Sequence, residues 1–235
     1  MQGKTHRTGG MTAALGGYVA LGANQLLLGD VNPILQFTVI YPFAIYGSTA
    51  SDLDHHWGSS PQKDIISRVF NITLHAGTKI RRTLPERSMA SKVLWFFDAK
   101  HRSWQTHSYE TLALLIWLCV SSVSGSFSSF NHTEQSIFGL VMAGLSLGLI
   151  AHIVLDGITP EGINIATFVI LNHIKGTKVL PEKVRIVPQK HYFATGGPWE
   201  DLVYNVLRVT NVILLILAVY VTQPYRIVIN GVRFL

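Results

Sequence analysis

The sequence predicts an all-α fold, namely a multi-span helical membrane protein with about five apolar helices. Hydrophobic residues make up 48% of the 235 residues and charged residues only 14%, whereas about 25% of residues are charged in a typical soluble domain. Apolar runs of helical length alternate with polar segments. Most basic residues fall on one side of the resulting topology. We therefore expect a single membrane-embedded domain over residues 1–235.

The expected membrane spans cover residues 11–28, 34–50, 110–124, 137–155 and 202–222. They differ in length and in how far polar residues interrupt them. Asn24 and Gln25 interrupt the first run, and the second is close to the short limit for a membrane span. Thr106 or Ser108 is the expected N-cap of the third, with Glu110 favourable in its first turn. A soluble bundle that buries these helices is the alternative, favoured by the short first two runs.

Two large polar segments separate the apolar runs. Residues 57–100 form a basic insertion, with amphipathic helices expected near 64–76 and 88–98. The second of these helices is a candidate for the membrane surface. Residues 157–201 form the other large segment, in which 163–174 is apolar enough to pack or to dip into the interface. We expect both segments to be cytoplasmic.

The positions of the basic residues set the expected orientation in the membrane. Of the 19 Lys and Arg residues, only Arg226 and Arg233 fall on the side opposite the N-terminus and the two large segments. Cytoplasmic segments carry an excess of Lys and Arg, so the N-terminus and both segments should be cytoplasmic. This distribution accounts for the formal charge of +6 without a nucleic-acid partner. The single cysteine, Cys119, cannot form an intrachain disulfide.

Histidine and aspartate side chains cluster at the ends of the apolar runs on that same side. They are His6 before the first run, Asp52, Asp54 and His55 after the second, His101 and His107 before the third, and His152 and Asp156 at the end of the fourth. Antiparallel neighbouring helices would bring these ends together. Imidazole and carboxylate ligands suit zinc, with manganese or iron as alternatives. Because one catalytic zinc needs three protein ligands, one or two ions are expected.

Each cluster also has a purely structural interpretation. His152 and Asp156 are four residues apart and share one helix face, so they could bind a metal together or form a stabilising pair. Asp52 and Asp54 repel each other unless a cation neutralises them, but they could form a solvated helix end. Arg102 suits a phosphate group, and lipid headgroups at a membrane edge would suit it nearly as well.

These residues resemble the motifs of the YdjM-like, LexA-regulated, inner-membrane-associated metal-dependent hydrolases of bacteria and phages. The motifs read here as His6, Ser51 to His55, His101 to Ser108, and His152 to Asp156 followed by Thr159-Pro160. Ser51 stands where the family has proline, and the third motif has one extra residue and lacks its glycine. The resemblance spans roughly residues 1–165. It implies a bacterial inner-membrane location and hydrolase activity, without a substrate.

The sequence thus predicts a membrane-bound hydrolase of a phosphoester, either a phospholipid or a lipid-linked phosphate. Asp54, Arg102 and His107 are the expected catalytic residues, and Arg102 would hold the phosphate. A non-enzymatic membrane protein with a structural or regulatory metal is the alternative. A metal transporter is disfavoured because the polar residues lie at helix ends, while transporters bind near the midplane. The substrate and the oligomeric state stay open.

Overall fold

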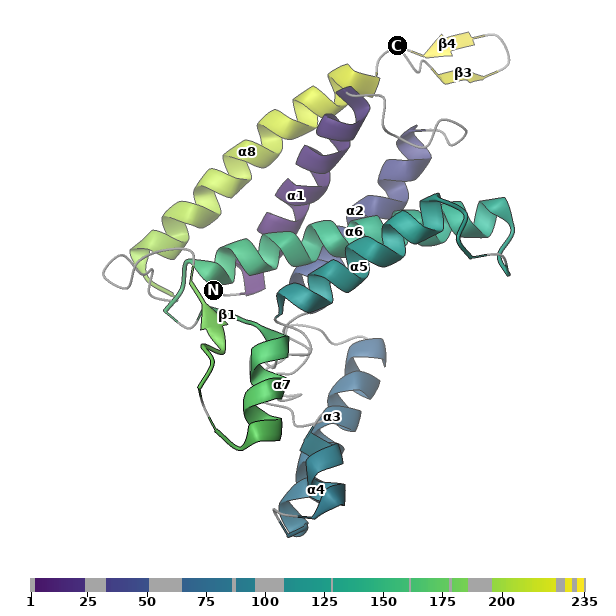
Figure 1. The fold of residues 1–235 in the computed structure, drawn as a ribbon. Coiled ribbons are helices and arrows are strands. Elements are labelled where there is room, and N and C mark those ends of the chain that lie inside the picture. The colour runs from purple at the N-terminus through teal and green to yellow at the C-terminus, as the bar shows by residue number, and fades with distance from the viewer. Residues whose placement is uncertain are drawn as a thin grey trace.

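The computed structural model describes residues 3–23, 33–50, 65–85, 88–95, 108–127, 129–160, 162–177, 179–185, 196–222, 227–229 and 232–234. Over these residues the chain is mostly helical, with eight helices and two short antiparallel ribbons of two strands each (Figure 1). The predicted helical fold is therefore confirmed. The sequence did not predict the two ribbons, because such short strands carry no periodic apolar signal.

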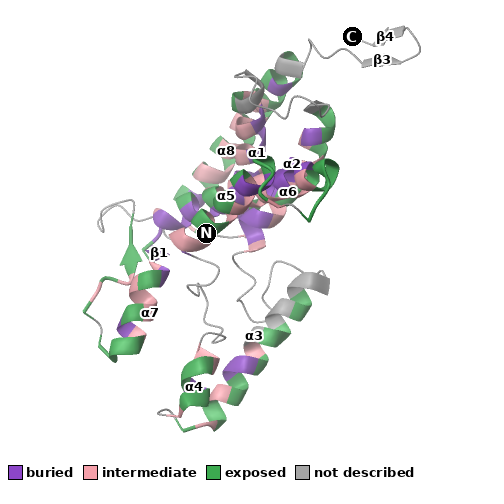
Figure 2. Cartoon of the chain, turned by 45° about the vertical axis from the view of Figure 1, so that its right-hand side comes forward, coloured by how far each residue is buried: buried purple, intermediate pink, exposed green. Residues whose placement is uncertain are grey.

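A bundle forms from the five helices α1 (Gly3–Ala23), α2 (Pro33–Ala50), α5 (Tyr109–Val123), α6 (His132–Gly157) and α8 (Pro198–Thr222). Helix α6 packs against α1, α2 and α5, while α1 also packs against α2 and α8 (Figure 1). Helix α8 starts beside the start of α1, where Thr5 donates a hydrogen bond to Glu200, and runs parallel to α1 as far as Ala218. The buried residues concentrate where α1, α2 and α6 meet (Figure 2).

A helix covers most or all of each predicted apolar run, but the first helix begins earlier than expected. Helix α1 starts at Gly3 rather than at residue 11, so His6 lies within the helix and not before it. Glycine has poor helix propensity, which makes the Gly9-Gly10 pair an unpromising helix interior. Both glycines, however, lie where α1 packs closely against α6 and α2. Tertiary packing therefore overrides local propensity in this part of the chain.

Two of the described helices, α6 and α8, are long and apolar enough to cross a membrane. The helical segments Ile34–Ala50 and Tyr109–Val123 are apolar but shorter. Large apolar side chains on α8 and α5 are exposed, among them Leu202, Val206, Val209, Val212, Ile216, Trp117 and Val120. Exposed large apolar side chains along a helix are the pattern expected where the helix faces lipid.

A smaller group of elements lies beyond one end of the bundle (Figures 1 and 2). It comprises α3 (Ile65–Thr83), α4 (Met89–Leu94), β1 (Ile163–Asn164), α7 (Ala166–Lys175) and β2 (Lys183–Val184). Strands β1 and β2 pair with Ile163 opposite Val184. The Trp95 ring after α4 stacks on His173 of α7, with ring centroids 3.8 Å apart. The remaining ribbon, β3 (Ile227–Ile229) with β4 (Val232–Phe234), lies near the C-terminus.

Among the side chains that the structure describes in α3 and α4, the buried ones are small or polar and many of the exposed ones are apolar. Gly77, Thr78 and Ser91 are buried, whereas the exposed side chains include Val69, Ile72, Ile80, Met89 and Val93. Both amphipathic helices predicted in this segment are confirmed, the first extending to Thr83 and the second ending at Leu94. Residues 65–85 and 88–95 contain five Lys or Arg residues and no Asp or Glu. A basic surface with exposed apolar side chains fits an anionic membrane surface.

Backbone amides of α3 and α4 should therefore exchange hydrogen more slowly in nanodiscs of anionic lipid than in nanodiscs of zwitterionic lipid. The physical reason is that Lys and Arg are attracted to an anionic headgroup layer. Hydrogen–deuterium exchange with mass spectrometry measures the difference, and α6 serves as the internal control because its exchange should be equal in both lipids. Equal exchange of α3 in both lipids would show that this surface does not bind the membrane.

Candidate metal centre

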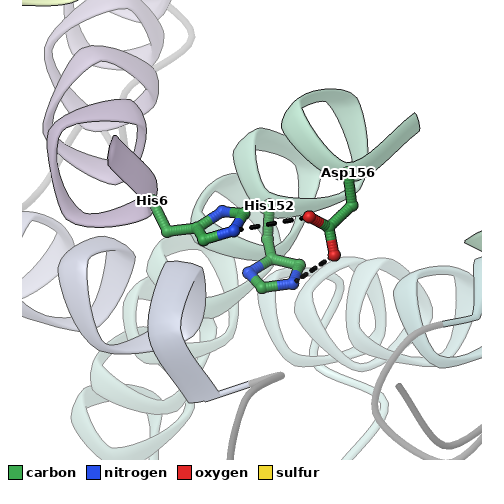
Figure 3. A group of neighbouring side chains, drawn as sticks. All are labelled: His6, His152 and Asp156. Atoms are coloured by element: carbon green, nitrogen blue, oxygen red, sulfur yellow. Dashed lines mark ion pairs between the residues drawn. The ribbon is translucent and has the colours of Figure 1, made fainter. Parts of the chain in front are cut away.

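At one end of the bundle, the first turn of α1 lies beside the last turns of α2 and α6. The first turn of α1 carries His6, the last turns of α6 carry His152 and Asp156, and the last turn of α2 carries Ser48. Figure 3 shows the two histidines and the aspartate pointing toward one another from α1 and α6. Helices α2 and α6 run parallel to each other and antiparallel to α1, so the start of α1 meets the last turns of both. The convergence expected from the sequence is therefore observed for His6, His152 and Asp156.

Three side chains share one small volume in this centre. His6 Nε2 lies 3.4 Å from Asp156 Oδ1, and His152 Nε2 lies 3.1 Å from Asp156 Oδ2. The two imidazole rings are stacked, with centroids 4.0 Å apart and an interplanar angle of 17°. One ligand atom from each residue lies within 4.8 Å of those of the other two. Two imidazoles and one carboxylate are a donor set that catalytic metal sites use.

The end of α6 holds Asp156 in place. His152 and Asp156 lie on the same face of α6 because they are four residues apart. The helix ends at Gly157, and the Asp156 carbonyl accepts hydrogen bonds from the Thr159 hydroxyl at 2.7 Å and from the Thr159 amide at 2.9 Å. These bonds satisfy a carbonyl that would otherwise lack a helical partner. The carboxylate is thus presented from a fixed turn.

The backbone of α2 determines which nitrogen of His152 carries a proton. His152 Nδ1 lies 2.7 Å from the carbonyl oxygen of Ser48. A carbonyl oxygen can only accept, so Nδ1 must donate and the ring, if neutral, presents a lone pair at Nε2. This lone pair then faces a carboxylate oxygen 3.1 Å away. Two acceptors so close repel each other unless a second proton or a cation lies between them.

The centre is almost completely buried. The exposed fractions are 1% for His6, 0% for His152 and 2% for Asp156. A carboxylate removed from water needs a positive partner. Either an imidazolium or a metal ion would supply the positive charge. A histidine that binds a metal commonly donates its other ring N–H to a backbone carbonyl, as His152 Nδ1 does here. The residues present therefore fit a divalent cation.

A neighbouring contact fixes the start of α5. The Ser108 side chain caps α5 by accepting from the Thr111 amide, which confirms one of the two predicted caps. Glu110 also binds the start of α7, a role that the sequence did not indicate. Its carboxylate accepts hydrogen bonds from the backbone amides of Ala166 and Thr167, each at 2.9 Å. Because Ile165 offers no side-chain cap, Glu110 caps α7 from another helix.

The structure brings together three of the eight predicted metal ligands. The others, Asp52, Asp54, His55, His101 and His107, lie outside the described residues, as does Arg102. Sequence reasoning missed Ser48, which acts through its backbone carbonyl and so leaves no signal in residue type. It also missed Glu200, which is buried beside the start of α1. Pro198 and Glu200 are typical of a helix start, and that signal was available.

Comparison with known proteins identifies the family. The model of the family described as YdjM inner membrane protein matches residues 1–168, which include His6, His152 and Asp156. A search of curated proteins gave no match. A search of solved structures gave none either. Because the family match covers more than half of the chain, from α1 to the start of α7, the protein belongs to the YdjM inner membrane protein family.

Proposed function

We propose that this protein is a membrane-bound metal-dependent hydrolase that cleaves a phosphoester at the cytoplasmic leaflet. The observation that carries the proposal is the buried group of His6, His152 and Asp156, in which both Nε2 atoms face one carboxylate. The substrate class is a phospholipid or a lipid-linked phosphate. Zinc is the first choice of metal, with manganese or iron as alternatives and one or two ions per chain.

Each residue of the centre has a defined part in this proposal. His6, His152 and Asp156 would hold the ion, and the Ser48 carbonyl keeps His152 in the tautomer whose Nε2 can bind it. When bound, a divalent ion would acidify a water molecule and stabilise negative charge on a phosphoryl oxygen. The Asp156 carboxylate would offset part of the charge of the ion, and the Thr159 bonds to the Asp156 carbonyl fix the turn that carries it.

The position of the centre supports a substrate at the membrane edge. The three residues lie at the ends of α1 and α6, and α6 is one of the two helices able to cross a membrane. We propose about five spans, with the N-terminus and the two large polar segments in the cytoplasm, because 17 of the 19 Lys and Arg residues fall on that side. Arg102 would bind the phosphate group, and Asp54 and His107 would complete the catalytic group.

The burial of the centre favours a second candidate function, a structural or regulatory metal site without catalysis. Exposed fractions of 0–2% are typical of a closed site, and a structural zinc is closed by four protein ligands. A catalytic zinc keeps one position open for water. The number of protein ligands and the presence of turnover therefore separate the two candidates.

Purified protein in lipid nanodiscs should release product from a panel of phospholipids and lipid-linked phosphates. A chelator should stop the release, and added zinc or manganese should restore it. Asp54→Asn should abolish turnover, because the amide keeps the shape but loses the charge, while Arg102→Ala should mainly raise KM. Asp201→Asn is the matched control, because Asp201 is exposed at the start of α8 and pairs with Lys4. Metal uptake without turnover on any substrate would favour the structural site.

A further inference from the structure

Glu200 is a buried carboxylate whose bonds connect α8 to the first turn of α1. Its side chain is 1% exposed. One oxygen accepts a hydrogen bond from the Thr5 hydroxyl at 2.7 Å, and the other accepts from the Gly196 amide at the same distance. Thr5 is the residue directly before His6. The contact therefore acts on the backbone of the turn that carries one of the three candidate ligands.

The first turns of α1 depend on such outside contacts. The helix begins at Gly3 and passes through Gly9 and Gly10, and glycine costs about 1 kcal/mol per position relative to alanine in a helix. The first four amides of any helix also lack helical partners. Helix α8 contacts this region again where Asn211 Nδ2 donates to the Thr8 carbonyl at 3.4 Å. The position of His6 therefore follows from α8 as well as from α1.

His6 needs this support more than the other two residues of the centre. His152 and Asp156 are held on one helix, whereas His6 comes from a separate helix. A metal ligand must be held within about 0.5 Å of its binding geometry. A small shift of the first turn of α1 would move the His6 imidazole away from Asp156 and leave the other two residues in place.

We infer that Glu200 is a positioning residue of the metal centre, acting through Thr5 on His6. The inference rests on the proposed metal site and adds a part for the segment after residue 168, which lies outside the family match. The simpler account is that Glu200 only caps α8 through Gly196. Thr5→Val separates the two accounts, because it removes the hydroxyl bonded to Glu200 and leaves the bond to Gly196 in place.

The first test is zinc affinity, measured by competition with a fluorescent chelator on the full-length protein. Thr5→Val and Glu200→Ala should each weaken zinc binding by about 10–100-fold, the usual effect of changing a contact that supports a metal ligand. Glu200→Gln keeps one acceptor oxygen and should lie between them and the wild type. Asp201→Asn should leave the affinity unchanged, because its exposed pair with Lys4 contributes little.

The second test asks whether the effect passes through His6. In a His6→Ala background, Thr5→Val should cause no further loss of zinc affinity, because the ligand that it positions is gone. An equal loss in both backgrounds would overturn the inference and leave Glu200 as a helix cap. So would wild-type affinity in Thr5→Val, and in that case the zinc bound by the wild type would still support the proposed function.

A third measurement does not depend on metal uptake. In metal-free, isotope-labelled protein, Thr5→Val should shift the imidazole nitrogen resonances of His6 and leave those of His132, at the far end of α6, unchanged. If the wild type binds no zinc, the proposed function fails, but a shift of His6 alone still supports its positioning by Glu200. Unchanged His6 resonances would overturn the inference whatever the metal content.

Discussion

Asp156→Asn should abolish high-affinity metal binding while the helices stay folded. The amide has the shape of the carboxylate but no charge, so it can neither neutralise a divalent ion nor offer two acceptor oxygens. At the contacts with His6 Nε2 at 3.4 Å and His152 Nε2 at 3.1 Å, the side chain would no longer offer a negative charge to an imidazolium or to a shared cation. The loss of affinity should exceed the about 10–100-fold caused by changing a residue that only supports a ligand.

Metal content after dialysis, measured by mass spectrometry of the elements, checks this expectation. Asp201→Asn is the matched control, because it makes the same change at an exposed aspartate. His132→Ala is a second control, since His132 is exposed at the opposite end of the same helix. Circular dichroism shows whether the variants stay helical. Wild-type metal content in a folded Asp156→Asn protein would mean that these residues form only a stabilising ion pair.

Gly148→Ala should destabilise the bundle by about 3 kcal/mol, the upper end of the usual cost of overpacking. A side-chain carbon at Gly148 would overlap the Ala44 carbonyl oxygen and the Ser48 amide nitrogen of α2. These are backbone atoms, so they can yield only if α2 and α6 separate. Because the Ser48 carbonyl binds His152 Nδ1, the separation should also weaken metal binding.

Gly16→Ala is the matched control for this packing effect. A side-chain carbon at Gly16 would meet only a Leu214 methyl group, at an ordinary 3.8 Å. Alanine also has the better helix propensity, so Gly16→Ala should be neutral or stabilising. Thermal unfolding in detergent gives both melting temperatures. Equal melting temperatures for Gly148→Ala and the wild type would show that α2 and α6 are not held in close contact.

Apolar runs predicted the positions of the bundle helices but not all of their boundaries. The run over 137–155 was long and uninterrupted, and a helix over His132–Gly157 contains it. Residues 1–10 are polar and end in the Gly9-Gly10 pair, so the sequence placed the start of the first run at residue 11 instead of at Gly3. Packing against α2, α6 and α8 stabilises the extra turns of that helix. The apolar pattern of residues 3–23 carries no information on these contacts, because they involve distant parts of the chain.

The candidate site was predictable where its geometry is local. The four-residue spacing of His152 and Asp156 places both on one helix face, and the structure confirms their contact. His6 was predicted from its place at the same end of the bundle, and it meets Asp156, which lies 150 positions further along the chain. Ser48 and Glu200 were not predicted, because one acts through its carbonyl and the other through a contact between the two ends of the chain.

Anomalous diffraction at the zinc absorption edge, from crystals of zinc-loaded protein, would show directly whether zinc binds to the three residues of the candidate centre. We expect an anomalous peak bounded by His6 Nε2, His152 Nε2 and a carboxylate oxygen of Asp156, with His152 Nδ1 still bonded to the Ser48 carbonyl. A second peak close to the first would indicate a two-metal site. A peak elsewhere in the molecule, or no peak in zinc-loaded crystals with these three residues well ordered, would show that these residues do not bind the metal.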